Sequence, residues 1–363
     1  MALFIQQMLE QRMLRSIAKA VIATVISIGL GIAADSAKTD EIWNMATAWG
    51  GGPFLEEDAK GFAKLVETLT DGRIQINVFP GGMLGSPLKV SDTVKSGVVQ
   101  VGHSWMGYDW GIDKTTLVFG GGPGHLNPEE FIIWLYEAGA ADLWFEYRKE
   151  KFGIASIPCT IAPTEIFLHS KKRVQTLEDL KGLKVRTSGA WAEIAGRLGA
   201  STVILPGAEV YPALERGVVD AIEWSSASVN LSSGFHKIAK YIIMPGIHAT
   251  GGAIECAFNL DTWERLSERD RELIKLAARL MVMDSWARYA YRDIAALEKM
   301  REAGNEFILL DSEFIRVSVK ATEEWEDEEA AKNPWFRRAL GHRRAFQEDM
   351  KNWPTFRFPI GQR

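Results

Sequence analysis

The sequence predicts an α/β fold in which a mainly parallel sheet is covered by helices on both faces. Apolar segments of strand type alternate along the chain with segments whose apolar residues recur at helical spacing, and glycine or proline separates them. Consecutive parallel strands need a crossover, which is usually a helix, so this alternation favours parallel pairing. A length of 363 residues, 47% of them hydrophobic, is enough for about two domains.

An export signal precedes the folded part of the chain. Arg12, Arg15 and Lys19 come before a charge-free apolar run over 20–34, and polar residues follow. A basic region, an apolar stretch of about 15 residues and small residues at its end are typical of a secretory signal peptide. A membrane anchor is the alternative, although a spanning helix needs about 20 apolar residues. We therefore expect residues 1–34 to be a cleaved signal peptide and the mature protein to lie outside the cytoplasmic membrane.

The first part of the mature chain predicts strands and helices in alternation. Residues 54–70 carry apolar side chains at helical spacing, and a glycine follows shortly after. Residues 73–79 alternate between polar and apolar side chains, as a half-buried strand does. The other elements predicted in this part are strands at 42–48 and 98–102 and a short helix at 88–96.

A second block of the same kind follows, and then the chain becomes helical. Thr176 is suited to cap a helix, and Asp179 stands at the position that completes a capping box. Residues 261–303 predict one long helix or a broken pair, and the tail from Phe314 is helical, charged and rich in tryptophan. The other elements predicted in this block are strands at 166–169, 182–186, 202–205 and 218–223 and helices at 190–198 and 209–216.

Charge and motif content argue against several classes of function. The net charge is −5, from 42 basic and 47 acidic residues, which disfavours a surface that neutralises nucleic-acid phosphates. The chain has no GxSxG, GxxxxGK[ST] or HExxH motif, and its six histidines show no i, i+4 pairing. The glycine cluster at 120–124 is interpreted as a turn. Cys159 and Cys256 form either one disulfide or two buried thiols, and we favour thiols because free cysteine behaves as a small hydrophobic residue.

Arg186 is the first candidate for a ligand contact. It ends an apolar strand just before a glycine turn and a helix. In open α/β sheets, ligands bind in the crevice beyond the carboxyl ends of the strands. A guanidinium group there offers a rigid fork of donors that matches a carboxylate. The alternative is a salt bridge on the surface.

Glu223 and Trp224 are the second candidates, because they follow another apolar strand. Trp224 can offer its backbone carbonyl to a cation and its ring to a ligand. The alternative is a capping carboxylate beside a tryptophan of the core.

Several segments, in the right order, resemble the solute receptors of TRAP transporters (tripartite ATP-independent periplasmic transporters). They are Leu-Lys-Gly-Leu-Lys-Val-Arg at 180–186, Leu-Gly-Ala at 198–200, Leu-Pro at 205–206, the run at 209–220 and Glu-Trp at 223–224. The run at 234–241, with the Pro-Gly at 245–246, resembles the branch that binds 2-oxo acids. The resemblance covers residues 40–310 and implies that Arg186 clamps the ligand carboxylate.

In that branch a cation bridges the substrate carboxylate and the protein. The resemblance implies that Glu223 and the backbone carbonyl of Trp224 are ligands of this cation. The branch has a glutamine as a further ligand, and Glu165 stands at that position here. A second carboxylate favours a cation more strongly, so Na⁺ or Ca²⁺ is expected. Tyr108 matches a tyrosine that bonds the ligand and Trp49 is expected to form a wall, although each could be a core residue instead.

The resemblance implies a small organic acid as the ligand. A 2-oxo or 2-hydroxy monocarboxylate is the first expectation, because the sequence shows one clear arginine clamp and not the two that would suit a dicarboxylate. Residues 225–230 depart from the branch, which usually has Gly-Pro and Asn-Asp there. Their small side chains predict a wider pocket that suits an aromatic or branched side group.

The resemblance also implies a two-lobe fold of the periplasmic-binding-protein type. Residues 40–160 together with 250–310 are expected to form lobe I, and 161–249 to form lobe II. The long helix that begins at Asp261 would span both lobes. Residues 311–363 are expected to form a helical extension, which either swaps between the protomers of a homodimer or packs on its own lobe.

The function implied is that of an extracytoplasmic receptor that passes its ligand to the membrane subunits of a TRAP transporter, with no catalytic cofactor and no chemical conversion. Three alternatives remain open. The same fold serves receptors of ATP-driven importers, and it serves binding modules that report to a signalling partner. An exported enzyme that uses Glu165 and Glu223 as an acid–base pair is the third.

Overall fold

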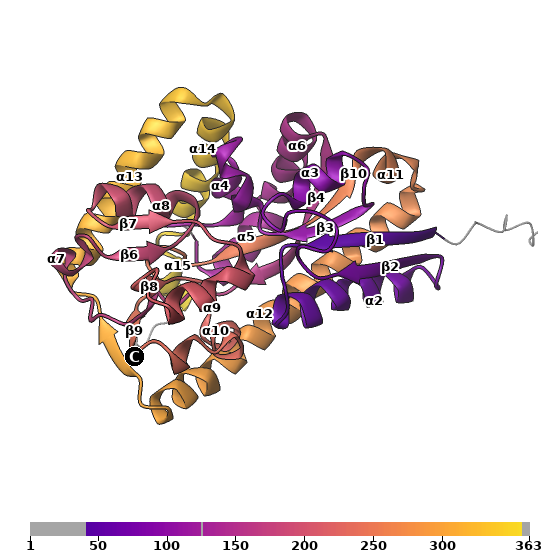
Figure 1. The fold of residues 1–363 in the computed structure, drawn as a ribbon. Helices are drawn as coiled ribbons and strands as arrows, with labels where there is room; N and C mark the ends of the chain where they lie inside the picture. Colours follow the sequence, from indigo (N-terminus) through magenta and orange to yellow (C-terminus); the bar gives the residue numbers. More distant parts are fainter. Residues whose placement is uncertain (1–40, 125, 358–363) are drawn as a thin grey trace, which may run out of the picture. The chain divides into compact units, whose positions relative to one another are not determined.

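The computed structural model describes residues 41–124 and 126–357. The signal peptide predicted at 1–34 lies outside these residues, as does the end of the tail at 358–363. In the described ranges the strands form two sheets, and helices cover both (Figure 1). None of the helices in these ranges is both long enough and apolar enough to cross a membrane.

The first sheet has five strands, in the order β2-β1-β3-β10-β4. β1 and β3 are parallel, whereas β10 runs antiparallel to both β3 and β4. The strands are β1 (Glu41–Thr47), β2 (Ile74–Phe79), β3 (Val101–Ser104), β4 (Ile154–Ala162) and β10 (Gly252–Asn259).

The second sheet has six strands, in the order β11-β9-β5-β8-β6-β7. β5 is antiparallel to β8 and β9, so both sheets are mixed and the prediction of a mainly parallel sheet is too simple. The strands are β5 (Leu168–Ser170), β6 (Lys184–Arg186), β7 (Ser201–Val203), β8 (Ala221–Ile222), β9 (Tyr241–Met244) and β11 (Glu306–Leu309).

The helices follow the predicted order, with additions. The segment at 54–70 is a π-helical turn, η1 (Phe54–Ala59), that continues into α2 (Lys60–Leu69). The capping box predicted at Thr176 is present at the start of α7. The other elements are α3 (Val90–Lys95), η2 (Met106–Gly111), α4 (Thr116–Gly120), α5 (Pro128–Tyr136), α6 (Ala140–Phe152), α7 (Leu177–Leu180), α8 (Gly189–Arg197), α9 (Gly207–Glu215), α10 (Ala227–Ser233), η3 (Phe235–Lys237) and α11 (Leu260–Arg265).

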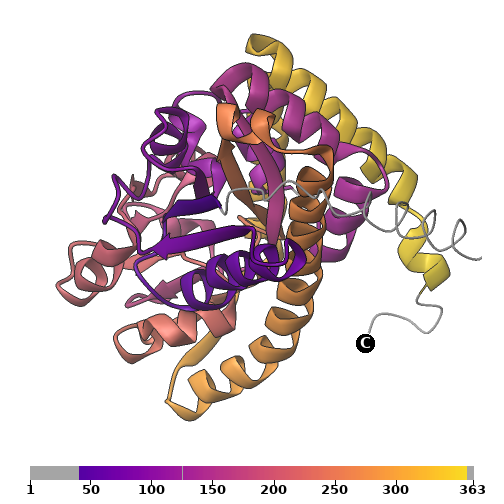
Figure 2. The same ribbon diagram turned by 90° about the vertical axis from the view of Figure 1, so that its right-hand side faces the viewer.

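The long helix predicted after Asp261 is a broken pair, in which α11 is followed by α12 (Glu268–Glu302). α12 contacts elements on both sides of the molecule (Figure 2). Tyr289 donates its hydroxyl to buried Asp58 of η1, at 2.6 Å. One turn further on, Asp293 accepts from the backbone N–H of Ser228 in α10, at 2.7 Å. After α12 the chain enters β11, which pairs with β9 of the second sheet, although 250–310 was expected in lobe I.

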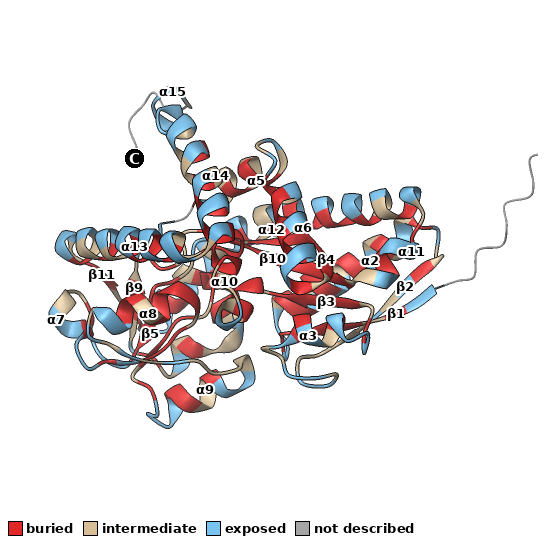
Figure 3. Ribbon diagram, turned by 90° about the horizontal axis from the view of Figure 1, so that it is seen from above, coloured by how far each residue is buried: buried red, intermediate tan, exposed pale blue. Residues whose placement is uncertain are grey.

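The C-terminal helices α13 (Ser312–Lys332), α14 (Pro334–Met350) and α15 (Trp353–Arg357) follow β11. α13 contacts α8, and α14 contacts α4 and α6 (Figure 1). The aromatic side chains of the tail are largely buried against the same chain: Trp325 is 2% exposed and Trp335 7%. Figure 3 shows this pattern, with buried residues on the inner faces of these helices and exposed residues outside.

Cys159 and Cys256 form a disulfide, so the prediction of two free thiols is wrong. The two residues are 97 positions apart in the sequence but lie on neighbouring antiparallel strands, β4 and β10. Their Cα atoms are 5.4 Å apart, a separation that a disulfide can span. The pairing of β4 with β10 brings them together, and the sequence did not predict β10.

Candidate functional site

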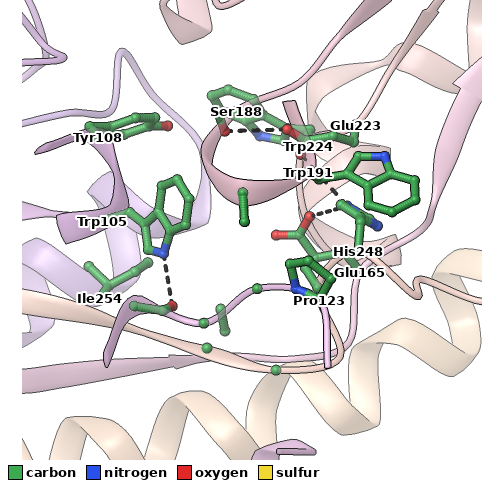
Figure 4. Close-up of a pocket in the computed structure, with 18 of the residues that line it drawn as sticks. Trp105, Tyr108, Pro123, Glu165, Ser188, Trp191, Glu223, Trp224, His248 and Ile254 are labelled. Carbon is green, nitrogen blue, oxygen red and sulfur yellow. Dashed lines mark hydrogen bonds and ion pairs between the residues drawn. The ribbon is translucent and has the colours of Figure 1, made fainter. Parts of the chain in front are cut away.

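A cavity with an empty volume of about 720 Å³, including its open mouth, is lined by residues of both sheets and their loops (Figure 4). All six residues singled out from the sequence line it. They are Trp49, Tyr108, Glu165, Arg186, Glu223 and Trp224.

Arg186 lies at the carboxyl end of β6 and is 1% exposed, so it does not form a surface salt bridge. Its Nη1 donates to the Oε1 of Glu223, at 3.1 Å, and to the backbone oxygen of the same residue, at 3.0 Å. Its Nε and Nη2 donate to the Leu205 carbonyl, at 3.3 and 3.0 Å. The guanidinium also lies over the ring of Trp224, 5.1 Å from its centroid. These contacts fix the cation in the cavity wall and engage most of its five N–H groups.

Glu223 follows β8 and is also buried. Besides Arg186, its Oε1 accepts from the hydroxyl of Ser188 at 3.4 Å. Burial raises the pKa of Glu223, while the charge of Arg186 acts in the opposite direction. The Glu223 carboxylate is therefore held by the Arg186 guanidinium and the Ser188 hydroxyl at the polar end of the cavity.

Glu165 lies in the crossing between β4 and β5, and its backbone N–H donates to the carbonyl of Ala249. Its Oε2 is 3.0 Å from Nε2 of His248. Burial raises the pKa of Glu165 to about 8, against a smaller lowering by Arg186. Desolvation thus opposes a full negative charge on Glu165 unless further positive charge is bound nearby.

The polar end of the cavity fits a cation. One carboxylate oxygen of Glu165, one of Glu223 and a ring nitrogen of His248 all lie within 4.8 Å of one another. Carboxylate oxygens are the ligands that Ca²⁺ prefers, and two oxygens on one calcium ion are at most about 5 Å apart. Two desolvated carboxylates that share one guanidinium are stabilised by a bound cation.

Trp49 and Tyr108 line the cavity from the segment that carries the first sheet, and the Tyr108 hydroxyl lies within reach of the Arg186 guanidinium. The indole N–H of Trp49 donates to Nδ1 of His103 at 2.8 Å, which fixes the plane of the ring. The ring of Tyr108 meets that of Trp105 edge to face, with centroids 5.3 Å apart. Both predicted residues also pack in the core, so the alternative roles considered for them coexist: each is a core residue on one side and a cavity wall on the other.

Residues 45–333 match the family model of bacterial extracellular solute-binding proteins, family 7. The chain belongs to this family. A relative from Nostoc sp., named as a monocarboxylate 2-oxoacid-binding periplasmic protein, is 28% identical over 313 residues, which are 86% of this chain and 85% of that protein. The predicted resemblance to TRAP solute receptors is therefore confirmed.

Solved structures of TRAP solute-binding proteins support the same assignment. The protein from Bordetella bronchiseptica superposes with a TM-score of 0.85 at 27% identity, covering 88% of this chain and 95% of that chain. It is a mixed-occupancy dimer with copurified calcium and picolinate in one site. The protein from Pseudoalteromonas atlantica, with sodium and pyruvate, has a TM-score of 0.83 at 29% identity, covering 88% and 97%. The two-lobe α/β fold predicted from the resemblance is confirmed.

The cavity of this family 7 protein contains residues that sequence reasoning missed. His248 follows β9, and Trp191 is on α8; both pack against Phe167. No local pattern marks either residue, because each reaches the cavity only through the arrangement of the second sheet. Gly121 belongs to the predicted turn, but it pairs with Gly252 and forms part of the cavity wall. Its φ of 98° and the Gly251 oxygen, 2.4 Å from where a Cβ would stand, require glycine there.

Proposed function

We propose that this protein is a periplasmic receptor that binds a small 2-oxo or 2-hydroxy monocarboxylate together with a cation and delivers both to a TRAP-type membrane transporter. The observation that carries the proposal is the buried Arg186 beside Glu165 and Glu223 in one cavity. The relatives support the ligand class, since one is named for 2-oxo acids and similar structures hold pyruvate or picolinate with a metal ion.

Each residue has a proposed role. Arg186 and Tyr108 hold the carboxylate of the ligand with charge-assisted and neutral hydrogen bonds. Glu165, Glu223 and the backbone carbonyl of Trp224 ligate the cation, which neutralises the carboxylates and draws the oxo oxygen of the ligand to the polar end. Trp49 is a wall for the side group of the ligand.

The two lobes are proposed to close around the ligand. Lobe I is built on the first sheet, lobe II on the second, and β11 belongs with lobe II. A ligand held by Arg186 on one side and Trp49 on the other contacts both lobes only when they are closed, so it shifts the population toward the closed state. The closed receptor then docks on the membrane subunits. The ligand is bound and released without chemical conversion.

A homodimer through the C-terminal helices is proposed with α15 as the contact. Phe356 of α15 is 77% exposed, whereas the aromatic residues of α13 and α14 are largely buried in their own chain. One similar structure is a dimer.

Native mass spectrometry of the purified protein tests the ligand class. The expected result is a bound mass that corresponds to a small monocarboxylic acid with a metal ion, which disappears after denaturation. A screen of carboxylic acids by thermal shift, with calcium or sodium, should then show the largest rise in melting temperature for 2-oxo acids. A protein that no carboxylic acid stabilises, with either ion, would contradict the proposal.

A further inference from the structure

When both of its carboxylates are ionised, the polar end of the cavity has more negative than positive charge. Among the described residues that line it, Arg186 is the one permanently cationic side chain, and it faces the carboxylates of Glu165 and Glu223. The cavity can therefore accept more positive charge than Arg186 supplies.

His248 holds one of these two carboxylates. Its Nε2 is 3.0 Å from Oε2 of Glu165 and 3.8 Å from Oε2 of Glu223. Its Nδ1 is buried and has no hydrogen-bond partner among the described residues. A buried N–H without an acceptor is rarer than a bare acceptor, so the proton belongs on Nε2, which donates to Glu165.

This tautomer makes His248 a positioning residue and not a metal ligand. A histidine that binds a metal usually donates its other ring N–H to an acceptor, and Nδ1 of His248 has none in the described part of the chain. Its Nε2–H instead fixes one oxygen of Glu165 and leaves the other oxygen for an ion. The ring is itself held by Phe167 and Trp191, whose ring centroids are 5.5 and 6.5 Å away.

Membership of the family does not decide which ion is bound. The similar receptor from Pseudoalteromonas atlantica holds sodium with pyruvate, and the one from Colwellia psychrerythraea holds calcium with pyruvate. The two are 29% and 28% identical to this chain, with the same TM-score of 0.83. The charges of this chain's own residues must therefore decide which ion binds.

We propose that Glu165, oriented by His248, makes this site select a divalent cation over sodium. The proposal rests on the proposed function, because it counts the carboxylate of the ligand. When the carboxylate of the ligand is bound, three carboxylates face one guanidinium, so two negative charges are left uncompensated. Ca²⁺ compensates both of them, whereas Na⁺ compensates only one. Unbalanced charge is costly in a buried site, so the calcium form is the stable one.

Terbium luminescence tests ion selectivity without any organic acid. Tb³⁺ takes oxygen ligands as Ca²⁺ does, and tryptophans in the cavity wall can sensitise its emission. Without the acid, two carboxylates still face one guanidinium and attract Ca²⁺ more strongly than Na⁺. We therefore expect calcium to displace terbium from the protein at a concentration at least about tenfold below that of sodium, and the preference to be larger once pyruvate adds its carboxylate. Titration of pyruvate by calorimetry in calcium and in sodium should show the same preference in its Kd.

Variants separate the roles of the two residues. Glu165→Gln removes one charge at nearly constant volume and should reduce the calcium preference by about tenfold or more. Glu209→Gln, at an exposed position on α9, is the matched control and should change nothing. His248→Phe should weaken calcium binding, and His248→Gln, which keeps an N–H donor, should restore most of it. A merely structural role for His248 predicts no rescue by glutamine.

The outcomes distinguish the two proposals. Equal displacement by calcium and sodium, within threefold, would overturn the selectivity, and so would an unchanged preference in Glu165→Gln. Pyruvate binding in sodium alone would leave the proposed receptor function intact while overturning the selectivity. Calcium selectivity without binding of any short 2-oxo acid would support the ion site and contradict the proposed ligand class.

Discussion

Replacement of Arg186 by lysine is the sharpest test of the proposed ligand site. Lysine keeps the positive charge beside Glu223 and so avoids an unpaired buried carboxylate, which would cost about 3–5 kcal/mol of stability. It cannot reproduce the planar fork that bonds the Leu205 carbonyl and the Glu223 carboxylate at once. The variant therefore tests geometry separately from charge.

The expected loss of affinity follows from these contacts. Charge-assisted hydrogen bonds contribute about 1.5–3 kcal/mol each, and we expect the loss of one of them to the ligand carboxylate. Affinity for the acid should then fall by about tenfold to more than a hundredfold. The melting temperature should also fall, because the Leu205 carbonyl loses both of its donors.

Calorimetric titration with pyruvate in calcium, or with the acid that copurifies, measures the effect. Arg197→Lys is the matched control, because Arg197 of α8 makes a two-pronged salt bridge to Glu328 on the surface, away from the cavity. It should bind as the wild type does. An Arg186→Lys protein that binds within threefold of the wild type would refute the reasoning.

Three further predictions concern stability and closure. Lys114 lies 2.8 Å from the Glu193 carboxylate of α8, which joins the proposed lobes I and II. Lys114→Met should therefore weaken ligand affinity about fivefold without changing the cavity, and small-angle scattering should show a less closed receptor. Replacing Cys159 and Cys256 by serine should lower the unfolding free energy by about 2–5 kcal/mol in denaturant titrations; an unchanged midpoint would contradict it. Burial raises the pKa of Asp58 from 3.8 to about 6. Between these two pH values the folded state binds a proton at Asp58 that the unfolded state does not. Unfolding free energy should therefore fall as pH rises from about 4 to about 6, and Asp58→Asn should flatten that slope.

The residues singled out from the sequence line one cavity, whereas the order and direction of the strands were predicted less well. Arg186 and Glu223 each follow a short apolar strand, and parallel strands bring their carboxyl ends to one edge, so local pattern was enough to place them together. Glu165 and Tyr108 required the resemblance to a family, because nothing in their own segments marks them. β10 was missed because its buried apolar run has no alternation, and the disulfide was missed with it.

His248 shows what local pattern cannot supply. It lies in a loop after β9, in a run whose composition is typical of a turn, and its contact with Glu165 joins residues 83 positions apart. The contact depends on the crossings between the sheets, which place the end of β9 beside the start of β5. A residue of this kind becomes visible only when the topology is known.

The two sides of the cavity come from different parts of the chain, and this separation supports the proposal that a ligand contacts both lobes. The polar groups, Glu165, Arg186, Glu223 and His248, all belong to the segment that carries the second sheet. The aromatic wall around Trp49 comes from the segment that carries the first sheet. The polar side alone offers charged groups but no wall of the first-sheet segment for the rest of the ligand, and the aromatic side alone offers an anion only the neutral hydroxyl of Tyr108. An organic acid has a carboxylate for the polar side and a side group for the aromatic side, so it binds more strongly when it contacts both.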